Sequence, residues 1–116
     1  LRTGPIQKRN FQAHIFFYLL TKKGNKMDQV RASHILVKTQ EEAQNIINEI
    51  KSFDDFTRLA KEHSLCPSGK NGGDLGFFRR GQMVKPFEDA AFGIQVGNFT
   101  TPVPTQFGYH VIIRTA

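Results

Sequence analysis

The sequence of 116 residues has only one cysteine and no tryptophan. A single cysteine cannot close a disulfide within the chain, so nothing in the sequence indicates an oxidising compartment. Long apolar runs are missing too. The longest, residues 11–20, is interrupted by Gln12 and His14, and it falls short of the roughly 18 residues of a membrane-spanning helix. With 39% hydrophobic and 22% charged residues, we expect one globular domain with a single core.

Acidic residues are absent from residues 1–27, which carry six Lys or Arg. Residues 28–116 carry ten basic and ten acidic side chains, so the net charge of +6 belongs entirely to this N-terminal arm. A charge-balanced domain does not predict a face built for nucleic acid. We therefore divide the chain into a basic arm, residues 1–27, and a folded domain, residues 28–116.

We expect the arm to be disordered or not part of the working protein. Its basic composition around an apolar centre also fits a targeting or membrane-surface segment, although no small-residue cleavage site follows the apolar run. Contact of the arm with nucleic acid is a third interpretation. Without a clear targeting signal the cytoplasm is the default location, and we expect a monomer.

An alternating segment, residues 30–38, predicts a strand in which His34 shares one face with Ala32 and Leu36. Thr39 and Glu42 then match a capping box. Behind this cap four residues recur at helical spacing: Ala43, Ile46, Ile47 and Ile50. The sequence thus predicts a strand that passes directly into a helix.

A second helix is predicted to begin at Ser52, where Asp55 can repeat the cap. Its inner face would carry Phe56, Leu59, Ala60 and His63. Gly, Ser, Asn and Asp residues then predict a loop at residues 67–76. Pro86 predicts the start of a short helix that stops near Gly93.

The end of the chain predicts two strands. Residues 101–104 contain two prolines, which cannot donate to a ladder, and therefore suit a short edge strand. Residues 108–115 alternate again and predict a longer strand. With a further short strand before the last helix, this order is typical of an α+β domain with a small, largely antiparallel sheet.

Three reactive side chains lie in otherwise apolar settings: His34 and His110, in the first and last predicted strands, and Cys66. The end strands of a small sheet are often neighbours, which would bring the two histidines together. Each histidine alone also fits an isolated core position with a satisfied hydrogen bond. A cysteine nucleophile with a histidine base is a further interpretation, as is a metal site built on His63 and Cys66. The sequence shows neither an oxyanion site nor paired zinc-type ligand spacing for them.

An apolar set near the last predicted helix has two interpretations. Met83, Phe87, Ala91 and Ile94 recur near helical spacing, which is typical of a core. Beside a glycine-rich segment, Met and Phe equally suit a pocket for a small apolar ring. The residue pattern alone leaves both open.

Three segments resemble the parvulin family of peptidyl-prolyl cis/trans isomerases, in order and at family spacing. They are ASHILVK, HSLCPSGKNGGDLGFFRRGQMVKPFEDAAF and PTQFGYHVII, within a resemblance that runs from about residue 30 to residue 114. The resemblance implies a four-stranded antiparallel sheet wrapped by about four helices. This agrees with the order of elements read from the pattern.

The resemblance also implies catalytic roles. His34 and His110 match two family histidines that face each other beneath the active site, and Thr105 matches a hydroxyl that joins their network. Cys66 matches a position that holds Cys in many members and Asp in others. Because Asp is accepted there, we expect Cys66 to act through electrostatics and hydrogen bonds rather than through covalent attack.

Other matches imply a substrate pocket. Leu75, Met83 and Phe87 match the apolar residues that receive the proline ring, and Phe78 matches a neighbouring wall aromatic. Phe107 stands where phosphorylation-specific members carry a smaller polar residue, and we expect it to extend the apolar pocket.

Phosphorylation-specific parvulins carry an arginine-bearing loop between the first strand and the first helix, which binds the phosphate of the substrate. Here Lys38 is the only cation of that cluster, and Glu41 and Glu42 follow it. The resemblance therefore implies an isomerase that acts on unphosphorylated X–Pro bonds.

We expect the partners to be proline-containing polypeptides, with no cofactor and no metal. Nucleic acid or membrane contact would come only through the arm. The alternative function is a binding or chaperone module that holds proline-containing segments with little catalysis. A third interpretation gives the main function to the arm, which would tether the domain to nucleic acid or to a membrane.

Overall fold

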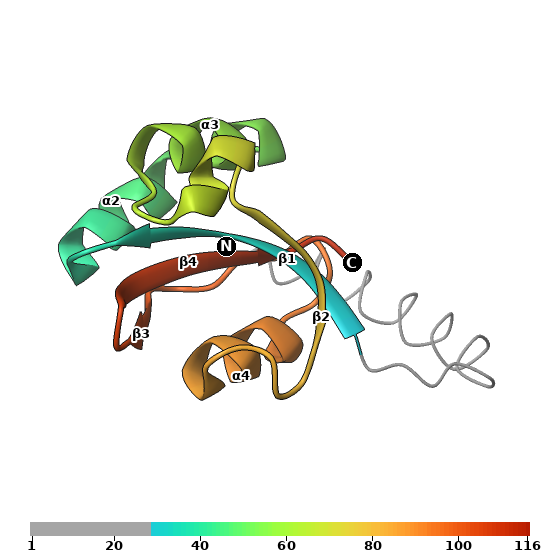
Figure 1. Cartoon of the computed structure of the whole chain (residues 1–116). Coiled ribbons are helices and arrows are strands. Elements are labelled where there is room, and N and C mark those ends of the chain that lie inside the picture. The colour runs from blue at the N-terminus through green and yellow to red at the C-terminus, as the bar shows by residue number, and fades with distance from the viewer. Residues whose placement is uncertain (1–28) are drawn as a thin grey trace.

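The computed structural model describes residues 29–116 (Figure 1). The N-terminal arm, with all that we expect of it, lies outside the described residues. Within residues 29–116, no helix is long and apolar enough to cross a membrane.

Four antiparallel strands form one sheet in the order β2-β1-β4-β3. The strands are β1 (Gln29–Val37), β2 (Asp74–Arg79), β3 (Val103–Thr105) and β4 (Gly108–Arg114). The first and last strands of the described chain, β1 and β4, are neighbours in the middle of the sheet, as predicted, and the proline-bearing β3 is an edge strand.

The helices lie on both faces of this sheet. Figure 1 shows α2 (Gln40–Glu49) and α3 (Phe53–His63) over one face and α4 (Lys85–Gly93) over the other. A short 3₁₀ helix, η1 (Pro67–Asn71), connects α3 to β2. The predicted α+β class, with a four-stranded antiparallel sheet wrapped by helices, is confirmed.

Two hydrophobic cores follow from this layering. Between the sheet and the helices α2 and α3 lies the α2–α3 core, with Ile35, Val37, Phe56 and Leu59 among its buried residues. The α4 core on the opposite face contains Val30, Ala32, Phe78, Phe87, Ala91 and Ile112. The alternation predicted for β1 is confirmed, and both of its faces are buried because a central strand carries helices on each side.

The helix caps are mostly as predicted. Thr39 and Glu42 form the reciprocal capping box of α2. At α3 the Ser52 hydroxyl accepts from the Asp55 N–H at 3.2 Å, but the Asp55 carboxylate bonds the Lys51 N–H at 2.9 Å instead of closing the box. The expectation that His63 lies on the inner face of α3 is wrong: its side chain is exposed in the last turn of the helix.

The predicted loop at residues 67–76 is too long. It contains η1 and the first residues of β2, separated by Gly72 and Gly73, which both have positive φ. Gly73 is held against β1, because its carbonyl accepts from the His34 N–H at 2.9 Å. Asp74 then pairs with Ser33 in the sheet. Long-range pairing therefore extends the strand into residues whose local composition favours a turn.

Gly73→Ala is expected to destabilise the fold far more than Gly76→Ala. Both glycines have positive φ, where an L-residue costs about 1–2 kcal/mol. A Cβ on Gly73 would also overlap the backbone carbonyl of His34, whereas a Cβ on Gly76 meets nothing within 4 Å. Denaturant unfolding should place the Gly73 variant at least about 2 kcal/mol below the Gly76 variant. Equal losses would contradict this account of the close approach.

Candidate active site

His34 and His110 form one contact between the two central strands. The register pairs His34 with Ile112 and Leu36 with His110, so the histidines are diagonal neighbours on the same face of the sheet. Their Nδ1 atoms are 2.9 Å apart and their rings stack at 5.1 Å with an interplanar angle of 17°. The sequence-based expectation that they lie side by side is confirmed, and neither is an isolated core histidine.

Burial keeps this pair uncharged near neutral pH. Burial, and then the neighbouring His110, lower the pKa of His34 from 6.5 to about 4. Burial also lowers the pKa of His110. In a neutral pair only one Nδ1 carries a proton, so one ring donates to the other.

Thr105 extends the pair into a short chain of hydrogen bonds. Its hydroxyl lies 2.7 Å from Nε2 of His110 and also accepts from the Phe107 N–H at 3.1 Å. At the other end, Nε2 of His34 is buried and has no hydrogen-bond partner within the described part of the chain. The tautomer of one ring therefore sets that of the other, and decides whether Nε2 of His34 is a donor or an acceptor.

Phe87 of α4 supports both histidine rings from one side. Its ring meets His34 edge-on at 5.3 Å and His110 edge-on at 5.2 Å. Phe78 of β2 lies 6.0 Å from Phe87 and is itself only 3% exposed, so it supports Phe87 from within the core. The apolar floor of the site is therefore fixed by packing on the α4 core.

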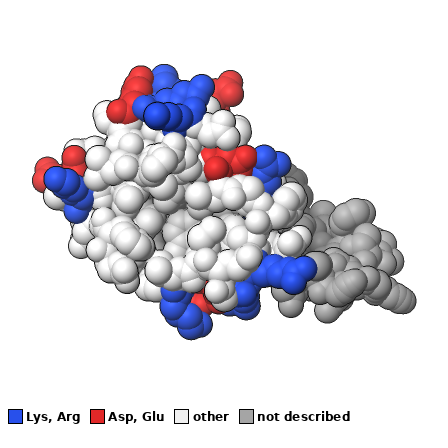
Figure 2. Space-filling view, viewed as in Figure 1, with Lys and Arg blue, Asp and Glu red and all other residues white. Residues whose placement is uncertain are grey.

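Leu75 and Met83 pack against the same α4 core and are each partly buried. They come from β2 and from the segment before α4, so three elements bring the predicted proline-binding residues into one cluster. Figure 2 shows that the surface between the α2–α3 layer and α4 is mostly uncharged on the face that it displays. Phe107, between β3 and β4, is 58% exposed and has no ring contact with this cluster, so its predicted pocket role stays a prediction.

Cys66 immediately precedes η1 and is partly buried. It lines a separate hollow of about 360 Å³ that also contains Lys61 and Lys70. Among residues 29–116, no hydrogen bond joins the Cys66 thiol to either histidine. Its backbone N–H bonds the Ser64 hydroxyl and its carbonyl accepts from Gly69. The structure therefore brings together the histidines, Thr105 and Phe87, and leaves the thiol outside their hydrogen bonds.

Glu88, in the first turn of α4, was missed by the sequence reasoning, which assigned it no role in a site. Its side chain is 7% exposed and accepts from the Gly81 N–H at 2.6 Å and from Arg80 at 3.0 Å. The hydrogen bond from the Gly81 N–H, and then the hydrogen bond and charge of Arg80, hold the pKa of Glu88 below its usual range. This carboxylate ties down the turn that precedes Met83. The sequence did contain a signal for this role. Glu88 lies three residues before Ala91 and so on the same helix face, and an acid on a buried face requires a hydrogen-bonding or charged partner.

Comparison with known proteins identifies the family of this chain. Residues 15–115 match the model of the PpiC-type peptidyl-prolyl isomerase (PPIase) domain. The chain therefore belongs to the family of PpiC-type PPIase domains, the rotamase or parvulin class. The match begins inside the N-terminal arm.

Three relatives illustrate the range of the family. The foldase protein PrsA of a Geobacillus species is 49% identical over 89 residues, covering 76% of this chain and 32% of the relative. NmPin, the parvulin of Nitrosopumilus maritimus, has a TM-score of 0.71 and 47% identity, covering 79% of this chain and all of that chain. A chain from the study of the SurA-like chaperones PEB4 and Cj1289 of Campylobacter jejuni has a TM-score of 0.76 and 45% identity, covering 90% of this chain and 45% of that chain. The chain spans about a third of the length of the longer curated relatives that it matches.

The histidine pair predicts an acid-dependent loss of stability. Below pH 6.5 the unfolded state protonates His34, whereas the folded state resists protonation until about pH 4. The free energy of unfolding should therefore fall between pH 6.5 and 4, with His34 contributing up to about 3 kcal/mol. Urea unfolding across this range should give a shallower dependence for His34→Gln than for wild type. His63→Gln, at the exposed end of α3, is the matched control. Parallel curves for wild type and His34→Gln would contradict the burial of a neutral ring.

From the contacts of the Glu88 carboxylate with the preceding turn, we predict that this residue helps to position Met83. Glu88→Gln should raise KM in a prolyl isomerisation assay more than it lowers kcat, with an overall loss of about tenfold, because Gln keeps only one acceptor oxygen and no charge to hold the turn before Met83. Asp89→Asn, its exposed neighbour, should change little. Since the pKa of Glu88 is lowered, its support is present above the ordinary value and is lost as pH falls through the folded value. An unchanged KM in Glu88→Gln would show that the turn keeps Met83 in place without the Glu88 carboxylate.

Proposed function

We propose that this domain is a peptidyl-prolyl cis/trans isomerase that acts on unphosphorylated X–Pro bonds of unfolded polypeptides. The observation that carries the proposal is the neutral His34–His110 pair resting edge-on against Phe87, beside apolar Leu75 and Met83. Membership of the PPIase family supports it.

The chemistry requires rotation without bond cleavage. The amide must lose its resonance, against a barrier of roughly 18–20 kcal/mol. An enzyme lowers this barrier by binding the twisted amide more tightly than the planar one. No atom is transferred, so the reaction needs no cofactor.

The predicted residues other than Phe107 each have a role in this scheme. Leu75, Met83 and Phe87 hold the proline ring in a dry pocket, and Phe78 supports Phe87 from the core. The histidine pair and Thr105 form an uncharged, hydrogen-bonding surface beside the twisting amide. Cys66 supplies a polarisable neighbour near the carbonyl, through electrostatics rather than covalent attack.

The link between β1 and α2 supports the proposed independence from phosphate. β1 ends at Val37 and α2 begins at Gln40, so only Lys38 and Thr39 connect them. The Thr39 side chain is engaged in the capping box, and Glu41 and Glu42 follow in the first turn. A link of this length leaves no loop for an arginine cluster, and two carboxylates beside Lys38 disfavour a dianionic phosphate.

A chaperone function is the second candidate, favoured by the likeness to SurA-like chaperones and to the foldase PrsA. In this alternative the same apolar pocket holds proline-containing segments without much catalysis. The cytoplasmic location and monomeric state stay predictions.

A protease-coupled isomerisation assay with Ser-Pro and phospho-Ser-Pro peptides tests the proposal. The Ser-Pro peptides should be turned over at least as well as their phosphorylated counterparts. Phe87→Ala should lower kcat/KM by about tenfold or more, because the proline ring and the histidines lose one shared support. Phe77→Ala, an exposed phenylalanine of β2, is the control.

Two results would overturn parts of the proposal. A strong preference for phospho-Ser-Pro would remove phosphate independence and point to Lys61 and Lys70, the cations of the hollow beside Cys66. Binding of the peptides without turnover would favour the chaperone function.

A further inference from the structure

A second, larger hollow lies on the other side of the sheet from the histidine pair. We name it the rear groove. Its volume is about 1040 Å³, and its lining includes Ser33, Ile50, Phe53, Phe99 and Ile113. Ser33 and Ile113 alternate with His34 and Ile112 along their strands, so they face away from the active site. Ile50, Phe99 and Ile113 belong to the α2–α3 core, whereas Phe87 belongs to the α4 core.

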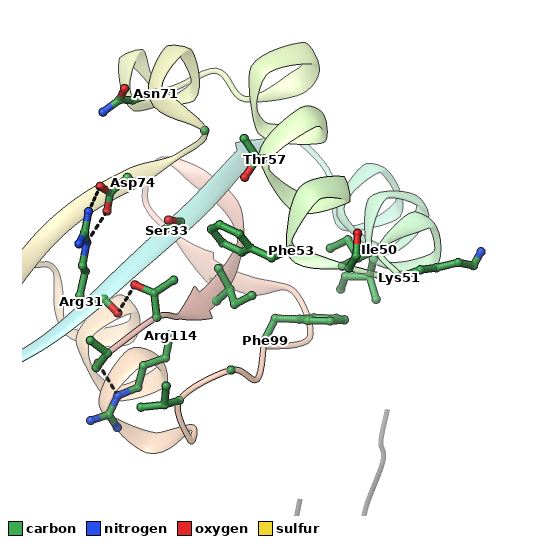
Figure 3. Close-up of a pocket in the computed structure, with 18 of the residues that line it drawn as sticks. Arg31, Ser33, Ile50, Lys51, Phe53, Thr57, Asn71, Asp74, Phe99 and Arg114 are labelled. Carbon is green, nitrogen blue, oxygen red and sulfur yellow. Dashed lines mark hydrogen bonds and ion pairs between the residues drawn. The ribbon is translucent and has the colours of Figure 1, made fainter. Parts of the chain in front are cut away.

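The rear groove exposes an ordered apolar surface. Phe53, the first residue of α3, is 50% exposed, and its ring lies parallel to that of buried Phe56 at 6.4 Å. Val96, which also lines the groove, is 37% exposed. Figure 3 shows that the side chains of Phe53, in α3, and Phe99, in the segment between α4 and β3, border the same space. An exposed apolar hollow with a prearranged aromatic is typical of a binding surface.

The ends of the rear groove carry an excess of positive charge. Its lining contains three cationic side chains, Arg31, Lys51 and Arg114, and one anionic side chain, Asp74. Arg31 and Asp74 form a bidentate pair, with contacts of 3.1 and 2.6 Å. Figure 3 shows this pair at one end of the hollow and Lys51 at the other. Complementarity therefore favours an occupant that combines apolar side chains with carboxylates.

The charge argues against the N-terminal arm as the occupant. Residues 1–27 carry six cations and no acid, so they share the sign of the groove. An unfolded polypeptide that binds at the active site is not limited to basic segments. About ten extended residues span roughly 33 Å, enough to pass around the edge of a single sheet and reach both faces.

We propose that the rear groove is a second binding site for the unfolded client itself, which holds an apolar, carboxylate-bearing segment about ten or more residues from the X–Pro bond. The inference rests on the proposed isomerase function and extends it to the choice of substrate. Binding at the groove raises the effective concentration of the proline at the active site. Long clients with suitable segments gain from this, and short peptides do not.

The test compares three 25-residue peptides with the same Ala-Pro site. Twelve residues before the proline, each carries a segment with Leu and Phe and either Glu, Lys or Ser at two positions. The Glu peptide should show a kcat/KM about tenfold above that of the Ser peptide, and the Lys peptide should fall below both. A tetrapeptide with the same Ala-Pro site reports the active site alone.

Phe53→Ser in the full chain should lower kcat/KM for the Glu peptide to the level of the Ser peptide, and leave the tetrapeptide within about twofold of wild type. Lys51→Glu should reverse the order of the Glu and Lys peptides. Lys85→Glu, an exposed cation of α4 outside the groove, is the matched charge control. Thermal unfolding confirms that each variant is folded at the assay temperature.

The outcomes separate the two proposals. Equal rates for the three long peptides, with active turnover of the tetrapeptide, would overturn the second site and leave the isomerase standing. If no peptide is turned over, the isomerase proposal fails, and fluorescence polarisation then tests the groove alone: Phe53→Ser must still weaken binding of the Glu peptide. A dimer in sedimentation that Phe53→Ser dissociates would assign the groove to a second copy of the chain and overturn the proposal.

Discussion

The antiparallel pairing of β1 with β4 is the constraint on which the rest of this domain depends. It joins segments at the two ends of the folded region and sets His34 within 2.9 Å of His110, which is 76 residues away in the chain. A shift of one residue in the register would turn His34 toward the α2–α3 core and break the pair. The site therefore exists only while the whole sheet keeps its register.

The same pairing gives β1 two separate faces. On one face, the histidines rest on Phe87 and the α4 core, where burial keeps them neutral. On the other, Ser33 forms part of the wall of the rear groove. The two faces of β1 therefore lead to two separate surfaces of the domain.

Sequence patterns predicted local features well where the interaction is local. The capping box at Thr39 and Glu42, the apolar face of α3 and the start of α4 near Pro86 all depend on residues three or four apart. The proximity of His34 and His110 followed from a general tendency of end strands to pair. The early start of β2 was not predicted, because long-range pairing with β1 decides it.

By itself, the sequence determined the class of fold, the order of its elements and the identity of the reactive side chains, since these follow from periodicity and from motif resemblance. Tertiary structure alone decided that Glu88 holds the turn before Met83, that no hydrogen bond links the thiol of Cys66 to the histidines among the described residues, and that a charged apolar groove opens behind the sheet. The physical reason is distance along the chain. Hydrogen-bond geometry, desolvation and the shape of a hollow arise only when segments dozens of residues apart are packed against each other.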